Sequence, residues 1–595
     1  MCGICGKLNL DYQTPVIRED LQEMANAIRH RGPDGEGLYL QGSVGLGHRR
    51  LSIIDLSTGD QPISNEDGTV WVVFNGEIYN YIELRAELQS KGHHFTTESD
   101  TEVIVHAYEE WGPESCAHLR GMFAYGLWDE VNQRLVLARD RLGQKPLLYT
   151  TSKDGFYFSS EFYALLQASN IAREVNLSAI NAYLTRLYVP TPQTAFCNIY
   201  KLPPAHYATV ENGAVKLTRY WHLDFSQKFT YSENELCEQL WELLRQTVQM
   251  RLMSDVPLGA FLSGGLDSSA VVGIMSQLVD EPIKTFSIGY KESGYDESRY
   301  ARQVADLFNT DHYEFTVNPN ALELLPKLIL HYGEPFADAS SLPTYYVSQL
   351  TRQYVTVALS GDGGDESFAG YERYQTAQML DLYRYLPLQI RQRLIPFVLD
   401  GVSQIPSMKN LGHQLQIVAQ RGMLQPETAY LYRHSVFTPD LAFALWQDDK
   451  MSSLTREDAA KDIILSLSEY NGHNSLDRWL YLDLKHYLTD DILVKVDIAS
   501  MINSLEVRSP FLDHKLIEFA AALPPNLKRR RLETKYILKK TLERLLPHNI
   551  IYRSKHGFQV PIDQWFQAEL KEVVREILLD RTTLSRGYFR PDKIE

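Results

Sequence analysis

The second residue of the chain is a cysteine, in the opening run Met1-Cys2-Gly3-Ile4. Removal of Met1 would give Cys2 both a thiol and a free α-amine. Because an α-amine titrates near pH ~8, its neutral fraction at neutral pH can accept the proton of the thiol. Cys2 would then be a nucleophile with its own general base. Taken alone, however, a cysteine at this position is more often a buried structural thiol.

A glycine-containing segment, Ser263-Gly264-Gly265-Leu266-Asp267-Ser268-Ser269, follows an apolar run and precedes a predicted helix. Two glycines let the backbone approach a ligand closely, and a helix N-terminus offers free N–H groups and a positive dipole. These features are typical of an anion site, most simply for a phosphate. The GK[ST] signature of the nucleoside-triphosphate P-loop is absent. From composition alone, a plain strand-to-helix turn is an equal alternative.

A second segment of this kind, Ser360-Gly361-Asp362-Gly363-Gly364-Asp365-Glu366, also follows an apolar strand. Ligands of an open parallel sheet bind at the carboxyl ends of its strands, so we expect both segments at one edge. Asp267 and Asp365 offer hard oxygen ligands, which suit Mg²⁺ bridging phosphates. Two matching loops therefore favour a nucleotide site over a pair of solvated turns.

The elements that would position these residues differ between the two parts of the chain. Up to about residue 210, short strands alternate with turns, and helices are predicted at 18–29 and 80–91, a largely antiparallel α+β pattern. From about residue 235, helices alternate with strands, which predicts a parallel sheet covered by helices. The strands predicted for this sheet are 256–262, 285–290, 312–317 and 354–359. Beyond residue 370 the pattern is mainly helical.

Composition excludes several classes of protein. The net charge is −16, from 59 basic and 75 acidic residues, which argues against nucleic acid or an anionic membrane as the main partner. Five cysteines in 595 residues do not make a disulfide framework. Neither a signal peptide nor an apolar run of membrane-span length is recognisable, so a soluble, cytoplasmic protein is expected. The pair His93-His94 has no third ligand candidate nearby and is interpreted as surface.

Taken together, the motifs resemble glutamine-dependent asparagine synthetase over essentially the whole chain. The segment Ser263–Ser268 matches the SGGxDS loop of the N-type ATP pyrophosphatases, and Cys2-Gly3-Ile4 matches the start of class II glutamine amidotransferases. The first part of the chain adds four short motifs that are jointly specific. They are His30-Arg31-Gly32-Pro33-Asp34, Arg50-Leu51-Ser52-Ile53, Asn75-Gly76-Glu77-Ile78-Tyr79-Asn80 and Ser99-Asp100.

The resemblance implies an N-terminal nucleophile glutaminase domain with an αββα sandwich at 1–215. A doubly wound α/β synthetase domain of the ATP-pyrophosphatase type follows at 235–595, with a helical C-terminal region. Glutamine would be hydrolysed to ammonia, while ATP adenylates an acceptor carboxylate. Ammonia would then displace AMP, with aspartate as the leading acceptor and asparagine as the product. Two alternatives stay open: the same chemistry on a sugar acid, peptide or biosynthetic intermediate, and an inactive nucleotide-sensing or scaffold protein.

The resemblance also implies roles for individual residues of the glutaminase site. Cys2 would attack the glutamine carboxamide, and Asn75 with Gly76 would form an oxyanion hole. Arg50 would pair with the glutamine α-carboxylate, which suits its planar fork. Glu77 and Asp100 would hold the α-ammonium.

In the synthetase part, Asp362 stands where aspartate-specific members have a glutamate, and it would position or deprotonate ammonia. Lys535 would neutralise charge on the adenylating phosphate, and Asp267 with Asp365 would bind Mg²⁺. The residues implied to bind ATP are Leu262, Ser263, Gly264, Gly265, Asp267, Ser268, Ile288, Ser360 and Gly361.

The acceptor-recognition stretch departs from the family pattern. Aspartate-specific members carry Thr-Thr-x-Arg-Ala-Ser, whereas this chain has Glu334-Pro335-Phe336-Ala337-Asp338-Ala339-Ser340-Ser341-Leu342-Pro343, without the arginine. Arg373, or a basic residue of the helical tail such as those of 528–540, would have to replace it. Small-molecule substrates are the expected partners, without nucleic acid or membrane, and a homodimer stays open. The segments 494–497, 506–513 and 555–558 are assigned framework roles only.

Overall fold

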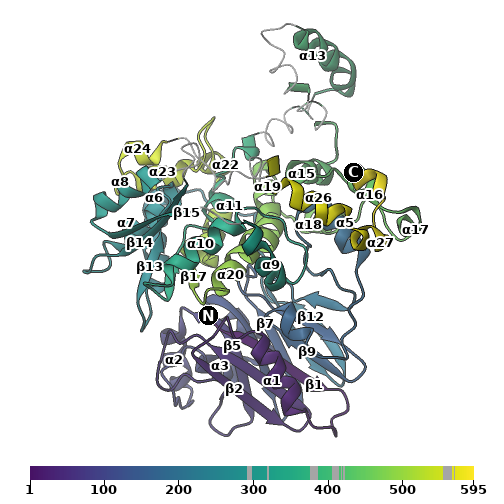
Figure 1. Ribbon diagram of the computed structural model, residues 1–595. Helices are drawn as coiled ribbons and strands as arrows, with labels where there is room; N and C mark the ends of the chain where they lie inside the picture. The colour runs from purple at the N-terminus through teal and green to yellow at the C-terminus, as the bar shows by residue number, and fades with distance from the viewer. Residues whose placement is uncertain are drawn as a thin grey trace.

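The computed structural model describes residues 1–290, 298–317, 321–375, 383, 386–404, 415–416, 419, 422–553, 566–567 and 570–594. Figure 1 shows a β-sandwich at the bottom, a second sheet with its helices above it, and a helical region at the upper right. The remaining residues include 555–558, so the expectation for that segment lies outside the described residues.

The sandwich consists of two six-stranded antiparallel sheets. In spatial order, the first sheet contains β10 (Ile199–Lys201), β8 (Leu148–Thr151), β9 (Gly155–Ser159), β1 (Gly3–Asn9), β3 (Val44–Arg50) and β2 (Gly35–Gln41). The second contains β12 (Ala214–Arg219), β11 (His206–Glu211), β7 (Arg134–Arg139), β6 (Gly121–Asp129), β5 (Val70–Ile78) and β4 (Ile63–Ser64). Strand β12 carries this sandwich past residue 215 to Arg219.

Apolar residues alternate along these strands, so each sheet buries one face against the other sheet. Ile4 and Phe158 from the first sheet pack against Val73 and Leu137 from the second. Helices α1 (Arg18–Ala27) and α4 (Phe162–Leu165) cover the outside of the first sheet. Helices α2 (Tyr81–Ser90) and α3 (Glu102–Trp111) cover the outside of the second. The αββα sandwich is therefore confirmed, as are the helices predicted at 18–29 and 80–91.

The second sheet region is parallel throughout. Its spatial order is β15 (Asp311–Val317), β14 (Lys284–Tyr290), β13 (Leu258–Phe261), β16 (Val357–Leu359) and β17 (Glu506–Arg508). The strand order reverses at β13, so the neighbouring carboxyl ends of β13 and β16 form a topological switch point, where ligands of such sheets bind. The doubly wound sheet is thus confirmed, and the predicted strands at 256–262 and 354–359 are each shorter in the structure.

Helices cover both faces of this parallel sheet. One face packs against α6 (Glu233–Met250), α7 (Leu266–Met275), α8 (Ser298–Phe308) and α23 (Tyr536–Leu542). The other packs against α10 (Ser341–Thr351) and α20 (Leu493–Met501). Helix α6 begins with a capping box, in which Ser232 and Glu235 satisfy each other's backbone N–H groups.

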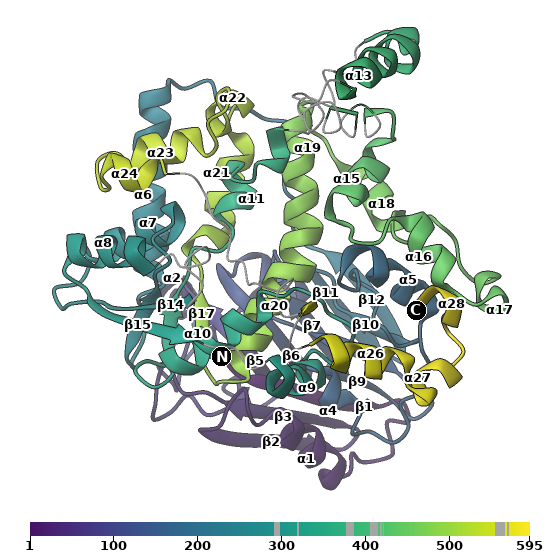
Figure 2. The same cartoon turned by 45° about the horizontal axis from the view of Figure 1, so that its top comes forward.

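A long helix runs through the centre of the molecule in Figure 2. It joins α19 (Ser475–Leu482), a π-helical run (Asp483–Ile492) and α20 without a break. π-Helical segments are uncommon and recur at functional sites. The other helices of this region are α5 (Leu177–Arg186), α11 (Gly364–Phe368), α13 (Ile395–Ser403), α15 (Pro426–His434), α16 (Pro439–Leu445), α18 (Lys461–Glu469), α21 (His514–Ala522), α26 (Lys571–Leu579), α27 (Arg581–Ser585) and α28 (Pro591–Ile594).

Within the part of the chain described above, no helix combines the length and apolar character needed to cross a membrane.

Candidate active site

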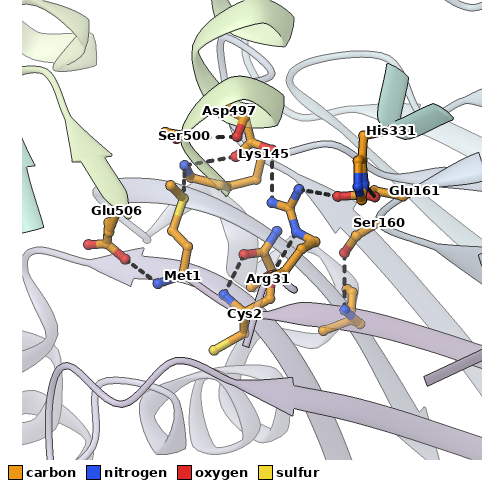
Figure 3. Close-up of polar contacts among 12 residues, drawn as sticks. Met1, Cys2, Arg31, Lys145, Ser160, Glu161, His331, Asp497, Ser500 and Glu506 are labelled. Atoms are coloured by element: carbon orange, nitrogen blue, oxygen red, sulfur yellow. Dashed lines mark hydrogen bonds and ion pairs between the residues drawn. The ribbon is translucent and has the colours of Figure 1, made fainter. Parts of the chain in front are cut away.

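Cys2 lies directly before β1, the strand that β9 and β3 flank in the first sheet. Its backbone N–H donates to Oδ1 of Asn75 at 3.0 Å, and its thiol faces the carbonyl of Leu51 at 3.9 Å. Arg31 Nε holds the Cys2 carbonyl at 3.1 Å (Figure 3). Burial raises the pKa of the Cys2 thiol, while the N-terminal charge opposes that rise. The structure thus brings Cys2 and Asn75 together from two different sheets.

Asn75 and Gly76 lie on β5, facing this cysteine. The Asn75 side chain is fully buried, and its Nδ2 donates no hydrogen bond to any residue that the structure describes. An unsatisfied buried donor costs free energy, and an anion arriving beside it would remove that cost. At Gly76 a Cβ atom would lie 2.0 Å from the Met122 carbonyl oxygen, so a side chain is excluded.

The other three residues predicted to bind the substrate glutamine are Arg50, Glu77 and Asp100, and they lie in the same part of the sandwich as Cys2 and Asn75. Arg50 ends β3, and its Nη1 pairs with Oδ1 of Asp60 at 2.7 Å. Asp100 accepts the Ile78 N–H at 2.8 Å, and burial raises the pKa of its carboxyl to about 6. Glu77 is buried, which raises the pKa of its carboxyl as well, and its Oε1 lies 3.1 Å from Nη2 of Arg508.

That arginine comes from β17 of the parallel sheet and was not predicted from the sequence. Arg508 is fully buried and also pairs with Glu506. Its carbonyl accepts the N–H of Ser360 at 2.8 Å, the first residue of the second glycine loop. Arg508 therefore contacts the sandwich through its side chain and the glycine loop through its backbone.

Met1 lies between the two parts of the molecule. Its α-ammonium pairs with Oε2 of Glu506 at 2.6 Å, and both groups are fully buried (Figure 3). Met1, Lys145, Asp362 and Asp497 are among the residues that line a cavity of about 20 Å³, enough for one water-sized molecule. The cavity thus lies between the residue preceding Cys2 and the second glycine loop.

The two glycine loops meet, as their places at the carboxyl edge of the sheet predict. A Cβ atom at Gly361 would lie 2.9 Å from Ser268 N, and one at Gly364 would lie 2.6 Å from Asp267 Oδ1. Gly264 has a φ of +69°, and a Cβ atom there would meet the Ala301 nitrogen at 2.5 Å. Each glycine therefore permits a close backbone approach that no side chain would allow.

Lys535 lies between the two aspartates of these loops. Its Nζ contacts Asp267 and is 2.7 Å from Oδ1 of Asp365. Burial lowers the pKa of this amine, but the two carboxylates raise it overall, so it stays charged. A side chain at Gly370 would collide with Asp365 and Lys535, which explains the glycine there.

The other residues predicted to bind ATP line the same edge. Leu262 follows β13, is buried, and donates its N–H to the Phe286 carbonyl of the neighbouring strand. Ile288 lies further along that strand, β14, and is also buried. In the first loop, the hydroxyls of Ser263 and Ser268 are 3.0 Å apart, and Gly265 precedes α7.

Asp362 faces the cavity beside Met1. The Ser360 hydroxyl donates to its Oδ2 at 2.8 Å, and the Ser509 hydroxyl donates to its carbonyl at 2.5 Å. Burial raises the pKa of the Asp362 carboxyl above its usual value. This carboxyl is therefore a stronger base than an exposed aspartate.

Two of the cations proposed to replace the missing arginine are engaged elsewhere. Arg373 pairs with Asp483 at 2.8 Å and stacks on Tyr371, and Lys528 is buried against Asp477 at 2.6 Å. Sequence reasoning missed Lys495, on α20, whose Nζ lies 2.8 Å from both Asp338 Oδ2 and Ser340 Oγ. It thus adjoins the departing stretch, and its charge is close enough to lower the pKa of Asp362. The only sequence signal was the family motif 494–497.

Comparisons with known proteins cover both parts of the chain. A family model described as asparagine synthase matches residues 239–595, and one described as a glutamine amidotransferase domain matches residues 1–221. The chain is 35% identical to glutamine-hydrolyzing asparagine synthetase 1 of Bacillus subtilis, over 98% of this chain and 90% of that protein. It is 34% identical to a putative asparagine synthetase of Methanocaldococcus jannaschii, over 84% and 98%. It is 28% identical to amidase chry2 of Gibberella zeae, over 99% and 93%.

Proposed function

Because this chain belongs to the asparagine synthase family and carries a glutamine amidotransferase domain ahead of the synthase domain, we propose that it makes asparagine from aspartate, glutamine and ATP. One observation carries the proposal: the cavity beside Met1 is also lined by Ser360 and Asp362, so the two sites adjoin. Ammonia released at Cys2 would pass this cavity on its way to the synthetase site. We place the division between the domains after β12, which ends at Arg219, and before α6, which begins at Glu233.

Glutamine hydrolysis requires a nucleophile, a base and an oxyanion site, and the residues around Cys2 offer all three. After removal of Met1, the α-amine of Cys2 accepts the thiol proton, and the thiolate attacks the carboxamide carbon. The Asn75 Nδ2 donor and the Gly76 N–H stabilise the oxyanion. Ammonia leaves, and water hydrolyses the thioester on Cys2. Arg50 orients the glutamine α-carboxylate, and Asp100 and Glu77 orient its ammonium.

Adenylation of the acceptor takes place between the two glycine loops. The loop backbone and the N-terminus of α7 hold the ATP phosphates, and Lys535 neutralises charge that develops as pyrophosphate leaves. Asp267 and Asp365 fit a Mg²⁺ site, because a single cation, the Lys535 ammonium, already contacts both carboxylates. Mg²⁺ bound by these two oxygen donors would supply further charge neutralisation on the phosphates. Ammonia then attacks the acyl carbon of the acyl-adenylate, the Asp362 carboxylate accepts a proton from it, and AMP leaves as the amide forms.

Aspartate is favoured as the acceptor because a cation and an anion lie side by side next to Asp362. Lys495 suits the α-carboxylate of an amino acid, and Asp338 suits its α-ammonium. A larger carboxylate is the second candidate, which the Phe336–Ser341 departure and the likeness to amidase chry2 favour. The intact Cys2 and Lys535 argue against an inactive scaffold.

We test the proposal by measuring aspartate-dependent release of pyrophosphate. With MgATP and glutamine, aspartate should give pyrophosphate and asparagine in equal amounts. The Lys495→Met variant should raise the aspartate KM at least about tenfold, since an unpaired buried carboxylate costs on the order of several kcal/mol. Its glutaminase turnover should stay within about twofold.

Lys515→Met is the matched control, because Lys515 is exposed and, among the residues that the structure describes, pairs only with Glu518. It should leave the aspartate KM unchanged. If saturating aspartate gives no pyrophosphate above background while MgATP binds, asparagine synthesis is excluded. A screen of larger carboxylates with the same readout would then identify the acceptor.

The Asp100 carboxyl should impose a pH dependence on glutamine binding. Burial raises its pKa to about 6, so the carboxylate is lost as the pH falls through about 6 rather than through ~4. Because only the carboxylate attracts the glutamine ammonium, kcat/KM for glutamine hydrolysis should fall by a further factor of about ten per pH unit below that point, in addition to the fall caused by protonation of the Cys2 α-amine. Asp100→Asn should lower kcat/KM and abolish this pH dependence. Asp67→Asn, at an exposed turn, should change neither kcat/KM nor its dependence on pH. A wild-type profile flat between pH 5 and 7 would contradict the role of Asp100.

A further inference from the structure

Four side chains with metal-binding groups converge on the outer side of the second sheet, outside both candidate sites. We call Glu66, His93, His106 and Glu109 the two-histidine cluster. Glu66 lies between β4 and β5, His93 follows α2, and His106 and Glu109 lie on α3. Figure 1 places α2 and α3 at the left of the sandwich. The interpretation of His93 as a plain surface residue is wrong, because its side chain is only 13% exposed.

The spacing of the four groups fits a tetrahedral ion. The Nδ1 atom of His106 lies 3.1 Å from Glu109 Oε2 and 3.6 Å from Glu66 Oε2. The Nδ1 atom of His93 lies 3.5 Å from the same Glu109 oxygen and 3.8 Å from Glu66 Oε1. Four ligands at about 2.0–2.1 Å from a tetrahedral Zn²⁺ are about 3.3 Å apart. The four ligand atoms lie within 4.8 Å of one another, so the most distant of them would draw together by up to about 1.5 Å around one ion.

Outer hydrogen bonds orient three of the four ligands. Both histidines turn Nδ1 inward, and Nε2 of His93 lies 3.1 Å from Glu110 Oε1. The Nε2 atom of His106 lies 3.6 Å from Glu102 Oε1, close enough for an ion pair but not for a hydrogen bond. Such carboxylate–histidine pairs are the usual outer shell of zinc sites. The amide of Asn65 holds Glu109 Oε1 at 2.8 Å, and the His94 N–H holds Glu66 Oε1 at 2.7 Å. These bonds leave Oε2 of Glu66 and Oε2 of Glu109 facing Nδ1 of His106.

The alternative is a metal-free ion pair with protonated histidine. Burial lowers the pKa of His106, but its carboxylate neighbours raise it to about 9. The chain has a second cluster of this kind, formed by His30, Glu161 and His331. There the negative charge of Glu161 is neutralised without a metal, because Arg31 pairs with it at 2.8 Å. In the described part of the chain, Glu66 and Glu109 have no lysine or arginine partner, and their ion pairs are with the two histidines.

We propose that the two-histidine cluster binds one Zn²⁺ ion through Nδ1 of His93, Nδ1 of His106 and one oxygen each of Glu66 and Glu109. Two imidazole nitrogens and two carboxylates suit Zn²⁺ better than Mg²⁺ or Ca²⁺, which prefer oxygen alone. With four protein ligands the site is closed and therefore structural. It ties α3 to the loop after α2, which also carries Asp100.

The test uses the full chain without a histidine tag. The protein is loaded with Zn²⁺ in the presence of a weak chelator, desalted, and analysed by elemental mass spectrometry. One Zn²⁺ per chain is expected, with an upward shift of the thermal midpoint of at least about 2 °C. Loading with Co²⁺ should give the visible absorption of a tetrahedral site.

His93→Gln and Glu109→Gln should each lose the bound Zn²⁺ and the thermal shift, with circular dichroism confirming a folded chain. His94→Gln is the matched control, because His94 is exposed and offers only its backbone N–H to Glu66. It should retain both. Absence of stoichiometric Zn²⁺ in the wild type would overturn the proposal. Equal Zn²⁺ in the wild type and His93→Gln would overturn it as well, since the ion would then bind elsewhere, for example at a thiol.

Discussion

Cys2→Ala is expected to lower glutamine-driven amidation by at least about 10⁴-fold while ammonia-driven amidation stays within about twofold. The variant lacks the nucleophile, and no nearby side chain replaces it, because Asn75 and Arg31 touch only the backbone of residue 2. Adenylation takes place between the two glycine loops of the other domain and does not require the thiol. Asparagine formed from glutamine, and separately from ammonium chloride, is the measurement.

Cys197→Ala is the matched control, since Cys197 is only partly buried and bonds the Val175 carbonyl far from the site. It should keep both activities. Loss of both activities in a folded Cys2→Ala variant would contradict the assignment of two separate sites.

Asp267→Asn and Asp365→Asn are each expected to lower aspartate-dependent pyrophosphate release by about 10²–10⁴-fold. Each substitution removes a carboxylate charge that pairs with Lys535 and that would bind Mg²⁺. Glutaminase turnover should stay within about twofold, because neither aspartate reaches Cys2. Pyrophosphate release at saturating MgATP and aspartate is the measurement.

The control for this pair is Asp280→Asn, at an exposed turn after α7, which should behave as the wild type. Formation of acyl-adenylate at the wild-type rate by either loop variant would refute the proposed metal site. A drop in glutaminase turnover equal to the drop in pyrophosphate release would instead indicate general unfolding.

The meeting of the two glycine loops was predictable from the sequence because it follows from local pattern and sheet rules. Each loop follows an apolar strand, and parallel strands present their carboxyl ends at one edge. As a result, Gly361 lies close to Ser268, and Gly364 lies close to Asp267. The αββα sandwich was not derivable in the same way, because antiparallel pairing depends on contacts distant in the chain. It came from the family resemblance.

Features that depend on tertiary packing escaped prediction. Helix α3 is buried from Glu102 to Tyr108, and its run Val103-Ile104-Val105 is typical of a buried strand. Lys495 is separated from Asp338 by more than a hundred residues, and only the fold makes them neighbours. The same holds for Glu66, which joins His93 and His106 through the packing of α3 on the second sheet.

In the described part of the chain, several fully or nearly buried ion pairs cross from the sandwich to the rest of the molecule, among them Met1 with Glu506, Arg31 with Asp497, and Glu77 with Arg508. Removing one partner of such a pair leaves an uncompensated buried charge, which costs about 3–5 kcal/mol. Loss of the two pairs named here that do not involve Met1 would therefore lower the free energy of unfolding of an isolated sandwich by an amount comparable to the stability of a whole domain. The two enzymatic halves are thus not interchangeable modules: a sandwich from another amidotransferase could be grafted here only together with the matching residues of α20 and β17.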